Sequence, residues 1–412
     1  MPSLTHNTPA LRFPGYTGVW EQQRFNELAL VRRGLTYKPS DVHASGIRVL
    51  RSSNIVEETF TTSPDDIFVQ DSAINIPFIQ NGDILVTAAN GSSRLVGKHA
   101  IVRNLLKNSA VPGGFMLCLS SPEPDFLNAS MSSSWYSKFI HVFVAGGNGS
   151  IGNISKSSLD MQPVLVPSLP EQRKIGSFFR HVDGLINLHQ RQTQKLTELK
   201  QGLLQDMFPR EGESVPRLRF PGFTDTWEQH QLNDYCGQLS ATLDPQKTPN
   251  SIFAEYSMPA FDNGEIPNIV TGNTMNSTRK ILDRSCLLIN KLNVRKKRIW
   301  LVDKPEDNAV SSAEFIPIYS DEISLKFLKY SVSNETFTTY LEECSSGSSN
   351  SQKRITPDVL MSAKLSFPSR REQDAIGQLM TVLDDLLALH EQYTMKLTHL
   401  KKGLLQKMFP QD

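Results

Sequence analysis

The chain has 412 residues, which allows two or three domains at about 150 residues each. It carries 43 Lys and Arg against 42 Asp and Glu. This balance excludes a histone-like polybasic protein and an acidic tail protein, although a local basic patch is enough to bind nucleic acid. The four scattered cysteines form no Cys-x-x-Cys pair. Together with the lack of a secretory signal or a long apolar stretch, they predict a cytoplasmic protein with reduced thiols, no metal site and no membrane span.

Two segments of the chain occur twice. The sequence Leu-Arg-Phe-Pro-Gly-Tyr-Thr at 11–17 recurs at 218–224 with Phe for Tyr, and both copies continue to Trp-Glu-Gln. The segment 194–209 recurs at 395–410. The stretches between these matches, 23–145 and 230–345, share little. A kept frame with different inserts predicts a duplicated, pseudo-twofold molecule whose two bodies recognise different things.

Each body contains short apolar runs between turn residues, which is typical of strands. The first body has such runs at 47–50, 84–87, 114–119 and 139–144, and the second has them at 286–289, 298–302 and 315–318. Helical patterns are few, with 323–331 as an example. We expect two β-rich α+β domains with long loops. Each ends in a small-residue loop, at 145–150 and 345–351, which is either a flexible linker or an anion-binding loop.

The repeated tails predict two long helices. Ser168 with Glu171, and Ser369 with Glu372, form capping boxes, and Pro209 and Pro410 end the helices. A seven-residue apolar repeat predicts that the two helices pack on each other as an antiparallel coiled coil. Its two His residues lie at the midpoints, where we interpret them as setting the register. The predicted packing residues are Ile175, Phe178, Val182, Leu185, His189, Leu196, Leu199 and Leu203 in the first helix, and Ile376, Leu379, Leu383, Leu386, His390, Leu397, Leu400 and Leu404 in the second.

The clearest candidate for an anion-binding site is the run Arg295-Lys296-Lys297-Arg298, because four adjacent cations are costly to gather unless an anion faces them. The alternative for each cation is a solvated surface charge. Cations of this kind bind phosphates, while a few side chains recognise base edges. The candidate DNA-binding residues are Arg32, Arg33, Arg94, Lys98, Arg103, Lys291, Arg295, Lys296, Lys297, Arg298, Lys353 and Arg354.

Motifs for catalysis are missing from the sequence. A DNA adenine methyltransferase needs an Asn/Asp-Pro-Pro-Tyr/Phe motif, and none occurs. Residues 91–99 end in Gly-Lys-His, without the spacing and the hydroxyl of a phosphate-binding loop. We therefore predict no catalytic residues in this chain. Two alternatives stay open: a stand-alone nuclease that uses a carboxylate pair such as Asp65-Asp66, and a coiled-coil scaffold with two β-rich adaptor domains that bind no DNA.

Taken together, the duplicated Arg-Phe-Pro-Gly and Trp-Glu segments, the Glu-Gln helix starts, the Gly-Leu-Leu-Gln-x-Met-Phe-Pro helix ends and the two dissimilar bodies resemble the specificity subunit of type I restriction–modification enzymes. The resemblance covers nearly the whole chain. It implies target recognition domains at 1–167 and 210–368 and conserved spacer helices at 168–209 and 369–412. One departure is Arg370-Arg371 at the second helix start, where the first has Leu169-Pro170.

The resemblance also implies partners and chemistry. Each recognition domain would bind one half of a split double-stranded DNA target, and the helices would dock two methyltransferase subunits. Two restriction subunits would join that core. The partners would use S-adenosylmethionine, ATP and Mg2+, with no cofactor in this chain. The chain itself would be a non-catalytic subunit of a type I site-specific deoxyribonuclease and adenine-N6 DNA methyltransferase.

Overall fold

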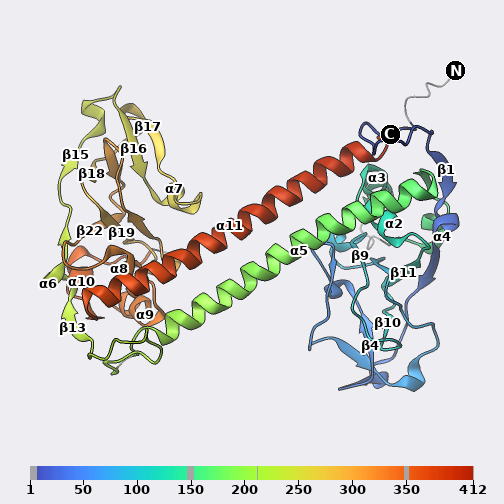
Figure 1. Cartoon of the computed structure of the whole chain (residues 1–412), viewed down its shortest axis with the longest axis horizontal. Coiled ribbons are helices and arrows are strands. Elements are labelled where there is room, and N and C mark those ends of the chain that lie inside the picture. Colours follow the sequence, from blue (N-terminus) through green and yellow to red (C-terminus); the bar gives the residue numbers. More distant parts are fainter. Residues whose placement is uncertain (1–6, 146–152, 211, 348–351, 412) are drawn as a thin grey trace. The chain divides into compact units, whose positions relative to one another are not determined.

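The computed structural model describes residues 7–145, 153–210, 212–347 and 352–411 (Figure 1). The chain forms two compact units. Unit 1 comprises the residues up to Gln190 together with those from Gln392 onward, and unit 2 comprises Arg191–Glu391. Because both boundaries fall inside long helices, each unit holds one β-rich body and a piece of each long helix.

The long helices are α5 (Leu169–Asp206) and α11 (Arg370–Met408), green and red in Figure 1. They confirm the two predicted helices and are about 57–59 Å long at 1.5 Å per residue. In unit 1, Asp183 contacts Lys401 and the ring of His189 stacks on Tyr393, with 5.1 Å between ring centroids. The numbers rise in one helix as they fall in the other, so the predicted antiparallel pairing is confirmed.

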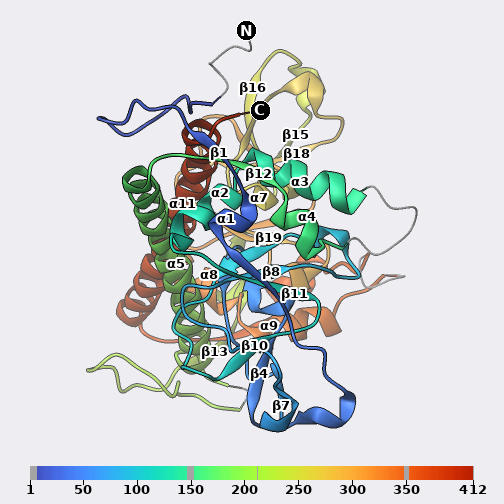
Figure 2. The ribbon, with the colours of Figure 1, turned by 90° about the vertical axis from the view of Figure 1, so that its right-hand side faces the viewer.

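Body 1 contains a four-stranded antiparallel sheet in the order β2-β11-β8-β9 and a second sheet in the order β10-β4-β7-β3. In Figure 2 the second sheet lies below β8 and β11. A two-stranded sheet, β1-β12, and the hairpin β5-β6 complete the body. The strands are β1 (Glu21–Arg24), β2 (Leu30–Arg33), β3 (Val42–His43), β4 (Ile47–Leu50), β5 (Ile55–Val56), β6 (Thr59–Phe60), β7 (Ile67–Val69), β8 (Ile84–Thr87), β9 (His99–Ile101), β10 (Ala110–Pro112), β11 (Met116–Ser120) and β12 (Pro163–Val166).

Body 2 repeats this plan with a different sequence. Its first sheet has the matching order β14-β22-β19-β20, its second sheet has the order β15-β18-β21-β16-β17, and β13 pairs with β23. In both bodies one strand of the second sheet, β10 or β21, is followed directly by a strand of the first sheet. The second-sheet strand pairs in parallel with β4 in body 1 and with β16 in body 2. The strands are β13 (Glu228–Gln231), β14 (Gly237–Gln238), β15 (Thr242–Leu243), β16 (Ile252–Tyr256), β17 (Asn268–Thr271), β18 (Arg279–Ile281), β19 (Cys286–Asn290), β20 (Ile299–Val302), β21 (Ala309–Ser311), β22 (Phe315–Tyr319) and β23 (Lys364–Phe367).

Short helices surround these sheets. The α-helices are α1 (Phe25–Leu28), α2 (Pro124–Met131), α3 (Ser134–Ala145), α4 (Lys156–Asp160), α6 (Leu232–Tyr235), α7 (Met258–Asp262), α8 (Leu325–Ser331), α9 (Glu335–Glu343) and α10 (Pro357–Met361). The 3-10 turns are η1 (Pro39–Asp41), η2 (Ser52–Asn54), η3 (Asp71–Ala73), η4 (Ser93–Leu95), η5 (Pro245–Lys247), η6 (Gly272–Thr274) and η7 (Val294–Lys296). None of the helices in the described ranges is both long and apolar enough to cross a bilayer.

One apolar run was assigned to the wrong element. Residues 139–144 were predicted as a strand and lie in α3. Tyr136 and Phe139, three residues apart, are both buried in the core of body 1. This is the spacing of a helix face, and a six-residue apolar run by itself does not distinguish a strand from a buried helix.

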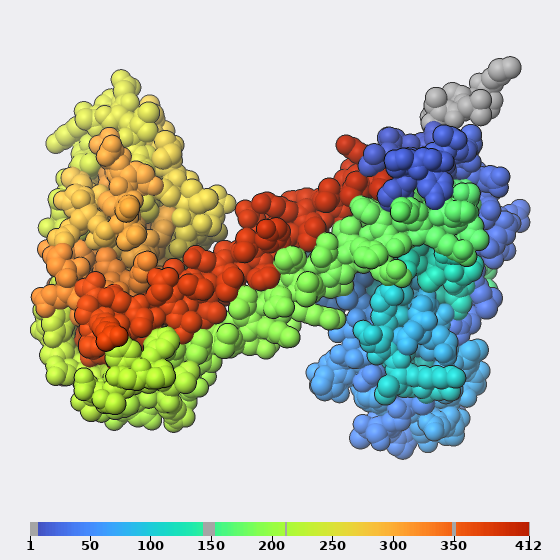
Figure 3. Space-filling model, viewed as in Figure 1, coloured from blue at the N-terminus to red at the C-terminus, as the bar shows by residue number. Residues whose placement is uncertain are grey.

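The ends of the long helices explain why the repeated segments occur together. In unit 1, Phe409 at the end of α11 packs on Trp20 and Phe126, with ring centroids 5.7 and 5.9 Å away. In unit 2, Phe208 packs on Trp227 at 6.1 Å. The end of α5 therefore completes the core of body 2, and the end of α11 completes the core of body 1. Figure 3 shows the red end of α11 against the blue N-terminal residues, where Leu11 N donates to Lys407 O at 2.8 Å.

The helix starts use their buried glutamates differently from the prediction. Arg12 donates to both carboxylate oxygens of Glu171, at 2.7 and 2.6 Å. Arg219 does the same with Glu372, at 2.7 Å for both bonds. In the predicted capping boxes these glutamates reach back to Ser168 and Ser369 instead. The bidentate pairs attach the Arg-Phe-Pro-Gly segment of each half to the start of its long helix.

Candidate nucleic-acid interface

Most of the predicted cations lie on or beside two equivalent hairpin loops, one in each body. In body 1 the loop joins β8 to β9 and contains η4, and in body 2 it joins β19 to β20 and contains η7. The strand registers match, because Met116 pairs with Thr87 in body 1 and Phe315 pairs with Asn290 in body 2. The first loop carries Arg94 and Lys98. The second carries the whole run 295–298.

The segments that precede α4 in body 1 and α10 in body 2 lie beside the starts of the two hairpin loops. Ile154 N donates to Ala88 O at 2.8 Å, and Ile355 N donates to Lys291 O at 3.1 Å. In body 2, Asn293 N also donates to Lys353 O at 3.0 Å. The fold therefore brings the 353–354 pair to the hairpin loop. Most of each small-residue loop, 146–150 and 348–351, lies outside the described residues, so the choice between linker and anion-binding loop stays open.

Three of the four adjacent cations in body 2 pair with carboxylates of the same chain. Arg295 pairs with Glu342 and Lys297 with Glu335, both on α9. Arg298 makes two hydrogen bonds to Asp262, at 2.7 and 2.6 Å. The bond and charge of Arg298 hold the pKa of Asp262 below its usual value.

An anion facing the four cations was expected from the sequence. These three carboxylates of the same chain provide most of that negative charge. The fourth cation of the run, Lys296, is exposed and has no carboxylate partner in the part of the chain that the structure describes. Nearby, Arg354 lies 3.3 Å from Glu314. Lys291 and Lys353, both half-buried, make no ion pair with described residues. Contact of these seven cations with DNA stays a prediction.

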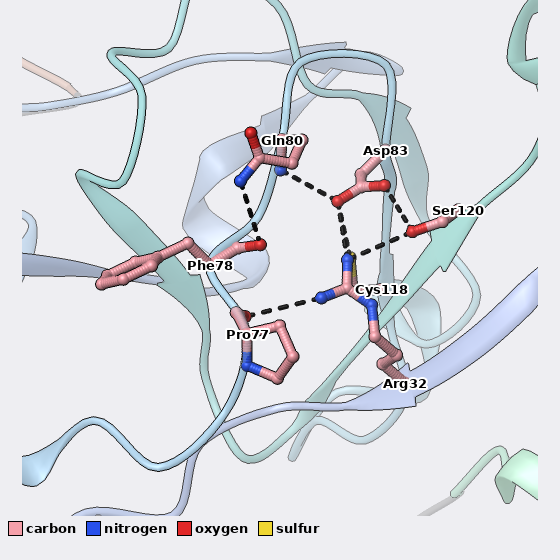
Figure 4. A network of polar contacts seen from close by, with 7 residues as sticks. All are labelled: Arg32, Pro77, Phe78, Gln80, Asp83, Cys118 and Ser120. Atoms are coloured by element: carbon pink, nitrogen blue, oxygen red, sulfur yellow. Dashed lines mark hydrogen bonds and ion pairs between the residues drawn. The ribbon is translucent and has the colours of Figure 1, made fainter.

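In body 1, Arg32 lies inside a polar network rather than on the open surface (Figure 4). Its Nη2 donates to Asp83 Oδ2 at 2.8 Å, to Cys118 Sγ at 3.1 Å and to Ser120 Oγ at 3.2 Å. Burial and the adjacent Asp83 raise the pKa of the Cys118 thiol, which therefore stays protonated. A DNA contact by Arg32 has to compete with this network, which joins β2 and β11 to the start of β8.

The other predicted cations of body 1 fall into two groups. Arg103 pairs with Asp125, at the end of the sheet opposite the hairpin loop. Arg33, Arg94 and Lys98 are exposed and have no ion-pair partner among the described residues. Arg33 ends β2, at the same end of the sheet as the loop, because it pairs with Leu117 next to Met116.

Sequence reasoning missed Arg51, which begins η2 beside the first hairpin loop. Its Nε is buried without a hydrogen-bond partner, and it makes no ion pair in the described ranges. Asn90 of the hairpin loop donates to Ser52 Oγ at 3.0 Å and so joins η2 to the loop. The sequence signal was an arginine directly after a predicted strand, at 47–50, and before a polar turn.

The predicted helix-packing residues divide by burial. Ile175, Val182, Ile376 and Leu383 are buried. The two His residues, Phe178, Leu196, Leu203, Leu379, Leu397 and Leu404 are half-buried. Leu185, Leu199, Leu386 and Leu400 are exposed, as are further apolar side chains on the same helices, namely Leu188, Val382 and Leu389. The long helices thus keep an apolar surface that the described part of the chain leaves exposed.

A duplicated charge cluster connects each body to the long helices. In unit 1, Lys401 Nζ lies 2.6 Å from Glu58 Oε2 and 2.9 Å from Asp183 Oδ1. Burial raises the pKa of Glu58, but the charge and hydrogen bond of Lys401 outweigh burial and lower it. Body, first helix and second helix meet at this lysine.

Unit 2 repeats the cluster with the equivalent residues of the duplication. Lys200 pairs with Asp384, and Tyr330 donates to the same carboxylate at 2.8 Å. Glu265 lies near this cluster, and its pKa is raised by burial because the charges of Lys329 and Lys200 offset the burial only in part. Both lysines lie inside the repeated segment of the sequence, which was the signal that could have revealed the clusters.

No three His, Cys, Asp or Glu side chains are placed to hold a metal ion in the part of the chain that the structure describes. Asp66 of the Asp65-Asp66 pair is buried, accepts from Asn54 at 2.8 Å and pairs with Arg48 at 3.0 Å. That carboxylate supports the local fold of body 1.

The fold and the loops define a protein with two β-rich modules of one design, each with a cation-bearing hairpin loop. Residues 19–198 match the family model described as the type I restriction modification DNA specificity domain. The chain is 26% identical over 189 residues to the type I restriction enzyme HindI specificity subunit of Haemophilus influenzae. That match covers 44% of this chain and 40% of the HindI subunit, so it spans about two fifths of that relative.

Two further comparisons cover nearly the whole chain. A putative type I restriction enzyme MjaX specificity subunit of Methanocaldococcus jannaschii is 24% identical over 411 residues, which are 94% of this chain and 92% of the relative. The crystal structure of a type I restriction-modification S subunit from M. genitalium has the same fold, with a TM-score of 0.61, 13% identity, and coverage of 98% and 100%. The chain is therefore similar, over nearly its whole length, to type I restriction–modification specificity subunits.

Proposed function

We propose that this chain is the DNA sequence-specificity subunit of a type I restriction–modification complex and recognises a bipartite target with one half-site per body. The observation that carries the proposal is the pair of equivalent hairpin loops, which share their place in the sheet and both carry cations but differ in sequence. Arg94, Lys98 and Lys296, which make no ion pair with described residues, suit phosphate contacts, and the side chains that differ suit base recognition.

The long helices connect the two bodies covalently and are proposed to fix the gap between the half-sites. Half-sites one helical turn apart lie about 34 Å from each other, which helices of about 57 Å can accommodate. On this proposal, lengthening both helices by a turn changes the gap and leaves the half-site sequences unchanged. An unchanged gap in such a variant would argue against this role.

The exposed apolar surface of the long helices supports a docking role. Leu185, Leu199, Leu386 and Leu400 are the side chains that a second protein is expected to cover, because exposed apolar surface favours association. The proposed partners are two methyltransferase subunits, through which two restriction subunits join. These partners are proposed to use S-adenosylmethionine, ATP and Mg2+ and to carry out adenine-N6 methylation and DNA cleavage, with this chain non-catalytic.

Methylation mapping tests the proposal directly. Methylated bases are sequenced across the host genome with the gene intact and with the gene deleted. We expect the deletion to remove one two-part N6-methyladenine motif, which gives both half-sites and the gap. If every methylated motif survives the deletion and the chain does not co-purify with a methyltransferase, the proposal is wrong.

A further inference from the structure

An exposed aromatic ring stands at the loop end of the first sheet of body 1. The side chain of Phe115 is 74% exposed. Its backbone is fixed, because Phe115 O accepts from Ala88 N at 2.9 Å and from Ala89 N at 3.1 Å. The next residue, Met116, is buried and pairs with Thr87 in the sheet. A large apolar side chain is therefore held in water by a rigid backbone at the start of the hairpin loop.

The surroundings of this ring are cationic. Arg94 and Lys98 come from the hairpin loop itself, and Arg51 lies beside Gly113, where a Cβ on Gly113 would be 3.6 Å from Arg51 Cγ. None of these three cations pairs with a carboxylate in the described part of the chain. Their charge complements DNA phosphates, which orient a protein on the duplex so that neighbouring side chains reach the bases.

The corresponding position in body 2 holds a different kind of side chain. Lys291 N donates to Glu314 O at 2.8 Å, the counterpart of the Ala88–Phe115 bond. Two residues before Phe115, Gly113 N donates to Leu50 O. Two residues before Glu314, Ser312 N donates to Tyr256 O in the same way. The backbone is thus the same in the two bodies, while Phe115 is replaced by Glu314. A residue that distinguishes two half-sites is expected to differ in this way.

We propose that Phe115 is a specificity-determining residue that contacts the 5-methyl group of a thymine in the half-site bound by body 1. This inference rests on the proposed function. In the major groove the thymine methyl is the apolar group that a base edge offers, and an aromatic ring is a suitable partner for it. The glutamate at the same position, Glu314, accepts from Arg354 and offers no apolar surface to a thymine methyl. The two bodies therefore differ in the base chemistry that this position favours.

The first test compares methylation motifs. The host methylome is mapped with the wild-type gene, with Phe115→Ala and with Leu106→Ala. Leu106 is the matched control, because it is 79% exposed in the same body and lies beyond Leu105, which bonds to Asn81 at the opposite end of the sheet. We expect Phe115→Ala to make one A·T position of one half-site degenerate, with the other half-site and the gap unchanged, and Leu106→Ala to keep the wild-type motif.

The second test probes the methyl group itself. The assembled complex is titrated with target duplexes that carry either thymine or deoxyuridine, which lacks the methyl, at that position. We expect the wild type to bind the deoxyuridine duplex about fourfold more weakly, the value of one buried methyl group. Phe115→Ala is expected to bind both duplexes equally, and Phe115→Leu to keep the preference for thymine.

Several outcomes would overturn the inference. They are an unchanged motif in Phe115→Ala, a change at both half-sites, and a thymine preference that survives in Phe115→Ala. If Phe115→Ala lowers the melting temperature and abolishes methylation, the methylome of Phe115→Leu becomes the deciding measurement. Loss of the wild-type motif in Phe115→Leu as well would rule out a specificity role for Phe115. A wild-type gene that directs no bipartite motif refutes the proposed function and is distinct from all of these results.

Discussion

Lys296 and Lys297 are neighbours in sequence whose surroundings differ. Because Lys297 is paired with Glu335 and Lys296 is exposed without a carboxylate partner among the described residues, the structure favours Lys296 for a phosphate contact. We expect Lys296→Ala to weaken binding of the assembled complex to DNA of any sequence and to lower the slope of log affinity against log salt by about one. Lys297→Ala is the control, and its slope is expected to stay near the wild-type value. A larger effect at Lys297 would contradict the assignment.

His99 is a buried histidine in body 1, and its Nδ1 lies 3.0 Å from Asn128 Oδ1. Burial lowers its pKa below 6.5, so the unfolded chain binds this proton first as the pH falls. The stability that His99 contributes is therefore present above pH 6.5 and is lost as the pH drops below it, by at most about 1.4 kcal/mol per pH unit. We expect His99→Gln to reduce the fall in melting temperature between pH 7 and 5, measured by calorimetry.

The control for this prediction is His141→Gln, at an exposed histidine of α3. It is expected to keep the wild-type pH dependence. An unchanged pH dependence in His99→Gln would show that the loss of stability at acid pH has another source.

Single residues show where sequence reasoning stops. The run 295–298 was visible in the sequence, and so was its position between two strands. Its partners were not, because Glu335 and Glu342 come from α9, about forty residues later, and only the fold brings them to the run. Arg32 is similar: its pairing with Asp83 depends on the register of β2, β11 and β8.

The long helices depend on the two duplicated lysine clusters. Lys401 is largely buried between Glu58 and Asp183, whereas the adjacent Lys402 is exposed. We expect Lys401→Met to lower the free energy of unfolding of unit 1 by about 1–3 kcal/mol, because it leaves two carboxylates without their shared donor. Lys402→Met serves as the matched control, with an effect within about 0.5 kcal/mol. Chemical denaturation of both variants measures the difference, and equal stabilities would exclude a structural role for the cluster.

Helices and strands could be predicted from the sequence where neighbouring residues alone determine them. Proline, the apolar repeat and turn signals define α5, α11 and the strands β4, β8, β11, β19, β20 and β22 from neighbouring residues alone. The short helices α2, α3 and α9 were not predicted, because their few turns gain most of their stability from packing against the sheets. The role of Glu171 was also missed, since its partner Arg12 lies 159 residues away in sequence.

At the scale of the whole molecule, the two units differ in how the chain builds them. Unit 2 is one continuous segment, Arg191–Glu391, whereas unit 1 needs both its own body and the residues from Gln392 onward. We expect the fragment 191–391 to fold alone. The fragment 1–190 is expected to lack stable tertiary structure until a peptide of residues 392–412 restores Phe409 to its site against Trp20. Near-ultraviolet circular dichroism with and without the peptide measures this.

The control is the same peptide with Phe409→Ala, which we expect to rescue fragment 1–190 poorly, since loss of a buried Phe costs about 3–5 kcal/mol. Cooperative folding of fragment 1–190 by itself would contradict the role given to the end of α11. The duplicated plan of the molecule was predictable from the repeats. The body that each helix end completes was not, because the Met-Phe-Pro ends are alike and only the fold shows which core receives each.

The use of the last helix turn in the first body has a consequence for synthesis on the ribosome. Domains usually fold in the order in which they emerge, with the N-terminal one first. Here every residue of unit 2 leaves the ribosome before Phe409 does, although unit 1 begins the chain. Body 1 must therefore wait, with Trp20 lacking its aromatic partner at the helix end, until translation is almost complete. A premature stop just before Met408 would consequently damage the module that was made first and leave the later one intact.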